Sequence, residues 1–354
     1  MKQIYKDLVN LPGVSSHEKY IRKYMRTHLE PLAEKIVEDN LGSIFGAINL
    51  DKEGPTVMLA GHMDEVGAMV QEITSKGLVK MLAIGGINPA VVISQHMNIV
   101  IDDGSFIPGV VGAKPPHLLR DNKTKQVSSF DDFFLDIGAD DFDHAVALGV
   151  KIGQQITFEN NYKESADGKK IFSKAWDNRF GSAMALDILE TVNKNEIPCK
   201  LYAGANVQEE VGLRGAITSS FKIKPDLFIA VDCSPCADTF DDSLVGGSLG
   251  RGFMIRFYDP RALLHQGMKK FIEETATKNK IKFQYYKSLG GTDAAAVQLS
   301  REGVLVCTIG MPARYIHSTT SIIHKDDYKA VKAVILAMLK EIDFNKIKEI
   351  KSNV

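Results

Sequence analysis

Hydrophobic and polar positions along this chain follow two patterns, one typical of helices and one typical of strands. Near the amino terminus, Ile21, Met25 and Leu29 recur at helical spacing, which predicts one amphipathic helix within the first forty residues. Further along, short apolar runs bounded by Gly, Pro and Asp are typical of strands. The runs at 43–50 and 56–64 therefore predict two strands, and the second ends directly in polar residues.

The stretch from about residue 68 to 165 consists of brief β-like runs with few helical patterns of useful length. Beyond it, helical patterns alternate again with apolar strands, which is typical of a mostly parallel sheet covered on both faces. These later elements are helices over 179–192, 263–278 and 328–342 and strands over 201–207, 227–231 and 304–309. We therefore predict an α/β domain formed by residues 1–67 and 166–354, with a small all-β, barrel-like domain inserted at 68–165.

Length and composition agree with this organisation. A chain of 354 residues exceeds one ordinary compact domain, and 44% hydrophobic with 25% charged residues excludes a disordered or collagen-like chain. The 43 Lys and Arg residues nearly balance the 44 Asp and Glu residues. The chain therefore lacks the global positive field that would gather nucleic acid or an anionic membrane.

Cysteine content and the apolar runs indicate a cytoplasmic protein. The four cysteines are too few and too unevenly placed for a disulfide framework. No stretch approaches 18 uninterrupted apolar residues, and the amino terminus has no apolar core, so we expect neither a membrane span nor secretion. The pair Cys233 and Cys236 has redox or zinc-binding spacing, but no second pair follows it, which favours a structural role.

Polar side chains follow apolar strands at the places where open α/β sheets gather their working residues. The second of the two early strands ends in His62 and Asp64, and the run 201–207 is followed by Glu209 and Glu210. The others are Asp232 after 227–231, His317 beyond 304–309, and Asp177 at the start of a helical pattern. Two histidines with several carboxylates form the ligand mixture that Zn²⁺ accepts and that Co²⁺ or Mn²⁺ can share.

Each of these residues also has an ordinary structural interpretation. Asp177 is in the position of a helix N-cap, and two adjacent glutamates usually lie on a solvated loop. Glu209 and Glu210 follow a buried strand, however, where their charges repel unless a cation offsets them. Extended backbone would point them to opposite sides, so that one would bind metal and the other would meet water. The same geometry lets Asp64 orient His62, or form a plain surface hydrogen bond with it.

Five ordered motifs together resemble the di-metal aminopeptidases of the TET family, and bacterial glutamyl aminopeptidases within it. The motifs span Gly61 to Gly67, Ala175 to Arg179, Val207 to Gly212, Ala230 to Pro235 and Arg314 to Ser318. The similarity covers nearly the whole chain, the β-rich insertion included. It implies a zinc-peptidase type of sheet and the removal of amino-terminal residues, Glu or Asp or alternatively Leu, from short peptides.

The resemblance also implies a role for each matched residue. Asp177 would bridge two divalent ions, Zn²⁺ or Co²⁺ with Mn²⁺ as an alternative. The remaining ligands would be His62 and Asp232 for one ion and Glu210 and His317 for the other, with Glu209 as general base and Asp64 as the support of His62. The resemblance further implies a homo-oligomer, a dodecamer built from dimers through the insertion, which would restrict access to short peptides.

Five more residues lie in segments that the resemblance places near the substrate pocket. They are Thr292 and Asp293 in a Gly-Gly-Thr-Asp loop, and the cations Arg256, Arg261 and Arg314. An acidic substrate side chain would favour bidentate contact with one such arginine. The ordinary interpretations are a turn for the loop and surface ion pairs for the arginines.

Three alternative functions remain open from the sequence. A related di-zinc amidase or carboxypeptidase would use the same kind of centre. Its insertion usually comes late in the chain, whereas here about 100 residues of β-like sequence separate Asp64 from Asp177. A carbohydrate hydrolase using Glu209 and a second carboxylate would not need His62 and His317. A non-catalytic scaffold, whose insertion only assembles oligomers, would hold no metal.

Overall fold

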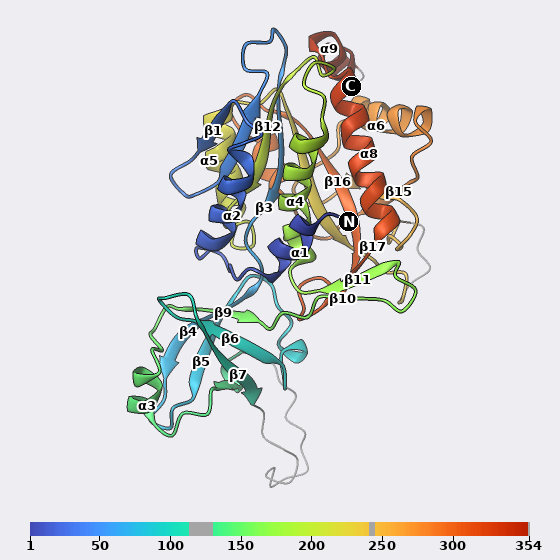
Figure 1. Ribbon diagram of the computed structural model, residues 1–354. Coiled ribbons are helices and arrows are strands. Elements are labelled where there is room, and N and C mark those ends of the chain that lie inside the picture. Colours follow the sequence, from blue (N-terminus) through green and yellow to red (C-terminus); the bar gives the residue numbers. More distant parts are fainter. Residues whose placement is uncertain (113–129, 241–244, 353–354) are drawn as a thin grey trace.

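The computed structural model describes residues 1–112, 130–240 and 245–352, and its larger part is built on one mixed sheet (Figure 1). The four central strands run parallel: β12 (Lys200–Asn206), β3 (Thr56–His62), β13 (Leu227–Pro235) and β16 (Leu305–Arg314). The flanking strands are β1 (Lys35–Glu38), β2 (Ile44–Ile48), β17 (Ser321–His324), β11 (Lys170–Ser173), β10 (Lys163–Glu164), β14 (Phe253–Tyr258) and β15 (Phe283–Lys287). The order is β1-β2-β12-β3-β13-β16-β17-β11-β10, with β14 between β15 and β16. Parallel pairing is thus confined to the centre and to the β14–β15 pair.

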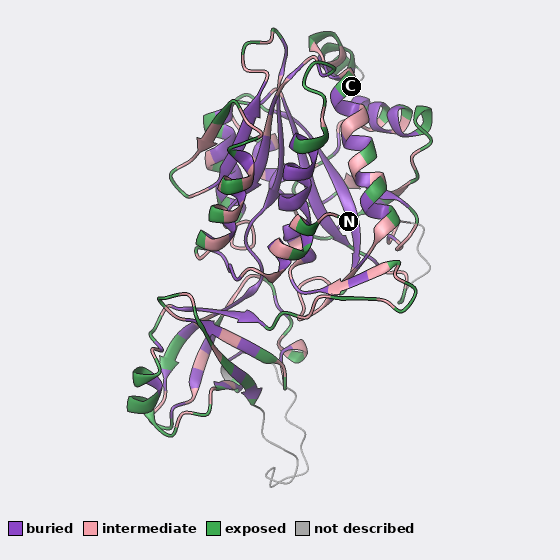
Figure 2. Ribbon diagram, in the orientation of Figure 1, coloured by how far each residue is buried: buried purple, intermediate pink, exposed green. Residues whose placement is uncertain are grey.

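Helices cover both faces of this sheet because its central strands are apolar on both sides. Val57 and Leu59 pack into the larger core, while Met58 and Ala60 point into a smaller core on the opposite face. The larger core includes α1 (Gln3–Asn10), α2 (Lys19–Leu29), α4 (Trp176–Thr191), α6 (Gln266–Lys278), α8 (Lys325–Glu341) and α9 (Phe344–Ser352). The smaller core includes α5 (Arg214–Ile223) and α7 (Asp293–Gln298). The sheet is accordingly buried along most of its length (Figure 2).

Six antiparallel strands between β3 and α4 close into a separate barrel, in the order β4-β5-β8-β7-β6-β9. Their bounds are β4 (Gly67–Ile73), β5 (Val79–Ile84), β6 (His96–Val100), β7 (Phe106–Gly112), β8 (Phe134–Asp136) and β9 (Gln155–Phe158). The barrel has its own hydrophobic core, together with the short helices η1 (Pro89–Val91), η3 (Phe130–Asp132) and α3 (Phe142–Ala147). The predicted fold class, an α/β sheet with an inserted barrel, is confirmed. No helix in the described parts of the chain could cross a membrane.

Several elements differ from the sequence prediction. The first forty residues form two helices, because α1 buries Tyr5, Leu8 and Val9 in addition to the expected α2. The last predicted helix begins earlier, at Lys325, where the ring of His324 accepts a hydrogen bond from the Asp326 amide. The helices α5, α7 and α9 and most flanking strands are short, and the sequence analysis did not predict them.

A buried charged cluster joins the barrel to the sheet domain. Glu65, on the segment between β3 and β4, lies 2.7 Å from Lys174 Nζ and 3.3 Å from Arg179 Nη2. Thr157 of the barrel strand β9 contributes its hydroxyl, which lies 3.1 Å from Glu65 and 3.0 Å from Lys174 Nζ. The charges and the hydroxyl satisfy one another, as buried polar groups must.

Candidate metal centre

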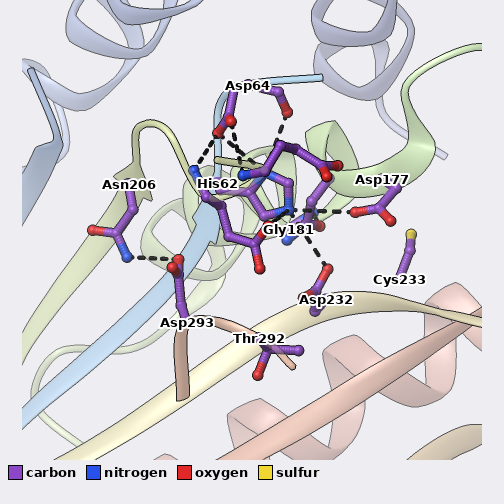
Figure 3. A network of polar contacts seen from close by, with 12 residues as sticks. His62, Asp64, Asp177, Gly181, Asn206, Asp232, Cys233, Thr292 and Asp293 are labelled. Carbon is purple, nitrogen blue, oxygen red and sulfur yellow. Dashed lines mark hydrogen bonds and ion pairs between the residues drawn. The ribbon is translucent and has the colours of Figure 1, made fainter. Parts of the chain in front are cut away.

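The candidate site lies at the carboxyl ends of the four parallel strands. Because these ends share one edge of the sheet, the side chains that follow them come close together. The site consists of His62 at the end of β3, Glu209 and Glu210 after β12, Asp232 in β13, His317 after β16 and Asp177 at the start of α4. Figure 3 shows the carboxylates of Asp177 and Asp232 pointing toward the ring of His62.

Asp177 lies between the two histidines. Its Oδ1 is 3.3 Å from His62 Nε2, and its Oδ2 is 3.3 Å from His317 Nε2. Among the described residues, no hydrogen bond from an amide of α4 to the Asp177 carboxylate is found, so the helix N-cap interpretation is wrong for this residue. Asn178 caps instead, through a 2.9 Å hydrogen bond from the Gly181 amide. Each oxygen of Asp177 is therefore free to face a different histidine.

Two glycines allow the start of α4 to approach the strands this closely. A Cβ on Gly61 would lie 2.4 Å from the Gly181 carbonyl carbon, and a Cβ on Gly181 would lie 2.2 Å from the Val231 oxygen. No side chain fits at either position, so glycine is required where backbone meets backbone. This contact places Asp177 beside His62.

The remaining carboxylates surround the two histidines. His62 Nε2 lies 3.8 Å from Glu209 and 3.9 Å from Asp232, and His317 Nε2 lies 3.5 Å from Glu210. The structure therefore brings all five predicted ligands and the predicted base into one site. Three sets of ligand atoms have all their members within 4.8 Å of one another: His62, Asp177 and Asp232; Asp177, Glu210 and His317; and His62, Glu209 and Glu210.

The carboxylates fit a divalent cation. Glu210 Oε1 and Asp232 Oδ1 are buried and have no hydrogen-bond partner. Burial, with the charge of Asp177 nearby, raises the pKa of Glu210 to about 8 and the pKa of Asp232 to about 7. Acids that resist ionisation at neutral pH in the metal-free site would ionise once a cation offset their repulsion. The unpartnered oxygens and the imidazoles form a ligand set that could hold a divalent metal ion.

Both histidines turn Nε2 toward the centre and Nδ1 away from it. His62 Nδ1 lies 3.3 Å from Asp64 Oδ1 and 3.2 Å from the Asp64 carbonyl oxygen. His317 Nδ1 lies 2.8 Å from the Gly86 carbonyl oxygen. A carbonyl only accepts, so Nδ1 of His317 carries the hydrogen and Nε2 keeps its lone pair for a metal.

Two buried acids fix the loop that carries the glutamates. Asp64 accepts hydrogen bonds from the amides of Glu209, at 3.0 Å, and Glu210, at 3.1 Å. Glu18 Oε1 accepts from the preceding Gln208 amide at 3.0 Å. The prediction of extended backbone here is wrong, because β12 ends at Asn206 and Gln208 has a φ of +55°. The glutamates face different histidines because of this turn. Glu18 belongs to no sequence motif and was missed.

A cavity of about 1070 Å³ opens from the site, and basic residues are part of its lining. These are Arg256, Arg261 and Lys287. Arg256 is only 6% exposed, donates to Ser234 Oγ at 2.9 Å and leaves its Nε without a partner. Within the described residues no carboxylate forms an ion pair with it. Its charge opposes the rise in the pKa of the nearby Asp232, and a buried guanidinium with no direct ion pair can still receive an anion.

Three of the predicted substrate-binding residues do not line this cavity. Arg314 forms a bidentate ion pair with Asp238, at 2.8 and 2.7 Å. Thr292 caps α7 and contacts Thr308, and Asp293 accepts a 2.8 Å hydrogen bond from Asn206 behind the site. Cys233 and Cys236 are buried free thiols that line the cavity.

The inserted barrel and the histidine–carboxylate cluster at a parallel sheet edge define a peptidase of the metal-dependent class. The family model of the M42 glutamyl aminopeptidases matches residues 42–334, and the chain belongs to this family. It is 42% identical to the glutamyl aminopeptidase of Lactococcus lactis subsp. cremoris in an alignment of 349 residues. The alignment covers 98% of each chain. The family resemblance found in the sequence is thereby confirmed, and aminopeptidase activity follows from it.

Solved structures agree with this assignment. The TET aminopeptidase of the archaeon Thaumarchaeota archaeon SCGC AB-539-E09 superposes with a TM-score of 0.95 at 28% identity, covering 98% of both chains. The TET1 peptidase of Pyrococcus horikoshii, which assembles into a tetrahedron or a large octahedral shell, has a TM-score of 0.86 at 29% identity. That match covers 96% of this chain and 99% of the other.

Proposed function

We propose that this aminopeptidase acts through two divalent ions, Zn²⁺ or Co²⁺ with Mn²⁺ as an alternative. The observation that carries the proposal is the position of Asp177, whose two oxygens each face a different histidine at 3.3 Å. His62 and Asp232 would hold one ion, and Glu210 and His317 the other. When bound, the ions would lower the pKa of a water molecule and polarise the scissile carbonyl.

Glu209 is proposed as the general base of the reaction. Its carboxylate borders the centre, and burial raises its pKa well above the usual range, as do the neighbouring Glu210 and Asp232, while His62 opposes the rise. A carboxylate with a high proton affinity suits a group that takes a proton from water and returns it to the leaving amine. Asp64 would hold the loop of Glu209 and the ring of His62 in place.

Metal removal tests the reaction class. We expect activity on aminoacyl anilides to disappear after treatment with EDTA and to return when Zn²⁺, Co²⁺ or Mn²⁺ is added to the dialysed protein. Full activity in protein shown to be metal-free would contradict the proposal. A carbohydrate hydrolase would retain its activity under chelation, and a scaffold would bind no metal at any stage.

We further propose a preference for peptides that begin with Glu or Asp, with Leu as an alternative. The relative from Lactococcus lactis is named a glutamyl aminopeptidase. In this chain the buried Arg256 on the cavity wall supports the same preference, because no carboxylate of the described residues forms an ion pair with it and a substrate carboxylate could do so. Arg261 and Lys287 add positive charge to that wall.

Replacing Arg256 with glutamine is expected to lower kcat/KM for a glutamyl anilide by about 10–100-fold, the value of a charged hydrogen bond. Turnover of a leucyl anilide should change much less. The exposed Arg251, which does not line the cavity, provides the matched control variant Arg251→Gln. A wild-type preference for leucyl or lysyl anilides, or equal losses on both substrates in Arg256→Gln, would contradict the assignment.

We also propose that the chain forms a homo-oligomer, a dodecamer built from dimers, in the cytoplasm. The assembly of the Pyrococcus horikoshii relative supports it, and the inserted domain at 68–165 would contribute contacts and restrict entry to short peptides. A second support is an apolar face on α5 and α7, where Ile217, Phe221 and Leu299 are 56%, 70% and 79% exposed around a groove. Apolar groups gathered in this way usually mark a protein interface.

The variant Phe221→Asp is expected to reduce the assembly to smaller species, because it places a charge in that apolar face. Light scattering coupled to gel filtration measures the mass directly. Phe344→Asp, at an exposed position on α9, is the matched control. An unchanged mass for Phe221→Asp would exclude this face from the assembly.

A further inference from the structure

We propose that the inserted barrel builds one half of the metal centre, through a turn formed by Gly85 and Gly86 directly after β5. This turn positions His317 and Glu210 and so sets the affinity for the ion that they hold. The inference rests on the proposed two-ion function and extends it, since the barrel would then help to orient ligands of the metal centre.

The first observation is the hydrogen bond from His317 to the barrel. His317 follows the end of β16, has a φ of +58°, and is 35% exposed, so its own surroundings hold it weakly. Its Nδ1 donates to the Gly86 carbonyl oxygen at 2.8 Å. Among the described residues this is the hydrogen bond that orients the ring, because Nε2 faces Asp177 and Glu210.

The second observation is the packing of Gly85 against the other ligand of the same ion. A Cβ on Gly85 would lie 3.3 Å from Glu210 Cβ, 3.4 Å from Glu210 Oε2 and 2.8 Å from Val66 Cγ1. Its φ of +80° already favours glycine. The turn therefore touches both Glu210 and His317, one with each of its glycines.

The two histidines of the centre are consequently oriented by different domains. His62 is 2% exposed and is oriented by Asp64, which lies on the same segment of the sheet domain. His317 depends on a carbonyl of the barrel. Partners that orient a metal-binding histidine typically change metal affinity by about 10–100-fold. A displacement of the barrel turn should thus lower the affinity for one ion and leave the affinity for the other unchanged.

The variant Gly85→Ala tests this directly, because its methyl group would displace the turn from Glu210 and Val66. Gly138→Ala is the matched control: it lies in the same inserted domain, its φ is +73°, and a Cβ there has no neighbour within 4 Å. Both proteins and the wild type are stripped of metal and titrated with Co²⁺ by calorimetry, which counts the ions and gives each dissociation constant without reference to activity.

We expect Gly85→Ala to weaken one of the two Co²⁺ ions by about 10–100-fold and leave the other unchanged, while Gly138→Ala matches the wild type. If Gly85→Ala does not fold, Gly86→Val replaces it, since a Cβ at Gly86 meets within 4 Å only the ring of His317. The same result is expected. If both Co²⁺ dissociation constants are unchanged, or if the affinity falls equally at both sites, the inference about the barrel turn fails while the proposed two-ion centre stands. A wild type that binds no Co²⁺ would overturn the proposed centre as well.

Discussion

Replacing Glu209 with glutamine is expected to lower kcat by about 10²–10⁴-fold while the protein keeps its metal ions. Glutamine has nearly the same shape and preserves the backbone hydrogen bond from the Glu209 amide to Asp64. It cannot accept a proton, however, which is the role proposed for Glu209. The loss corresponds to about 3–5 kcal/mol of activation free energy.

The measurement combines steady-state kinetics on an aminoacyl anilide with metal analysis of the same sample. Glu53→Gln, at an exposed glutamate in the turn before β3, serves as the control and should behave as the wild type. Turnover close to normal with an unchanged metal content would exclude Glu209 as the base. A large loss of metal would instead place Glu209 among the ligands.

The second large effect is expected from Asp177→Asn, which should impair metal binding itself. Removing a partner that only orients a ligand typically costs about 10–100-fold in affinity, so losing a shared ligand should cost at least about 100-fold. Asparagine is neutral, and it replaces one carboxylate oxygen with an NH₂ group that cannot bind a metal ion. Each oxygen of Asp177 faces a different histidine, so either replacement removes a ligand. Both ions should be affected because both would share this residue.

Equilibrium dialysis against Zn²⁺ or Co²⁺ measures this loss. Asp140→Asn, on an exposed loop of the inserted domain, controls for the removal of one negative charge. Retention of two ions with wild-type affinity would show that Asp177 does not bridge them. Loss of one ion alone would assign Asp177 to a single metal.

Most residues of the candidate site could be predicted because they follow apolar strands, whereas Asp177 stands at the start of a helical pattern. His62, Asp232 and His317 stand at or beyond the carboxyl ends of parallel strands, and this topology alone brings them to one edge. Which residues orient them could not be predicted in this way. Glu18 and Gly86 act through hydrogen bonds that span 190 and 231 residues, and no local pattern marks such contacts.

The same limit explains the errors in the prediction. The family resemblance placed the segment of Arg314 near the pocket, but its guanidinium pairs with Asp238, 76 residues away. The extended backbone expected at Glu209 and Glu210 is replaced by a turn, because Asp64 and Glu18 hold three successive amides there. Local sequence predicts the strands and their ends, whereas long-range partners decide the conformation beyond those ends.

The buried cluster of Glu65, Lys174 and Thr157 restricts how this protein can be recombined with its relatives. Thr157 belongs to the barrel, whereas Lys174 and Glu65 lie on the segments that leave and enter it. A chimaera carrying a foreign barrel without a hydroxyl at this position would leave the ammonium group one acceptor short in a dry environment. Workable crossover points should therefore keep all three residues from a single parent.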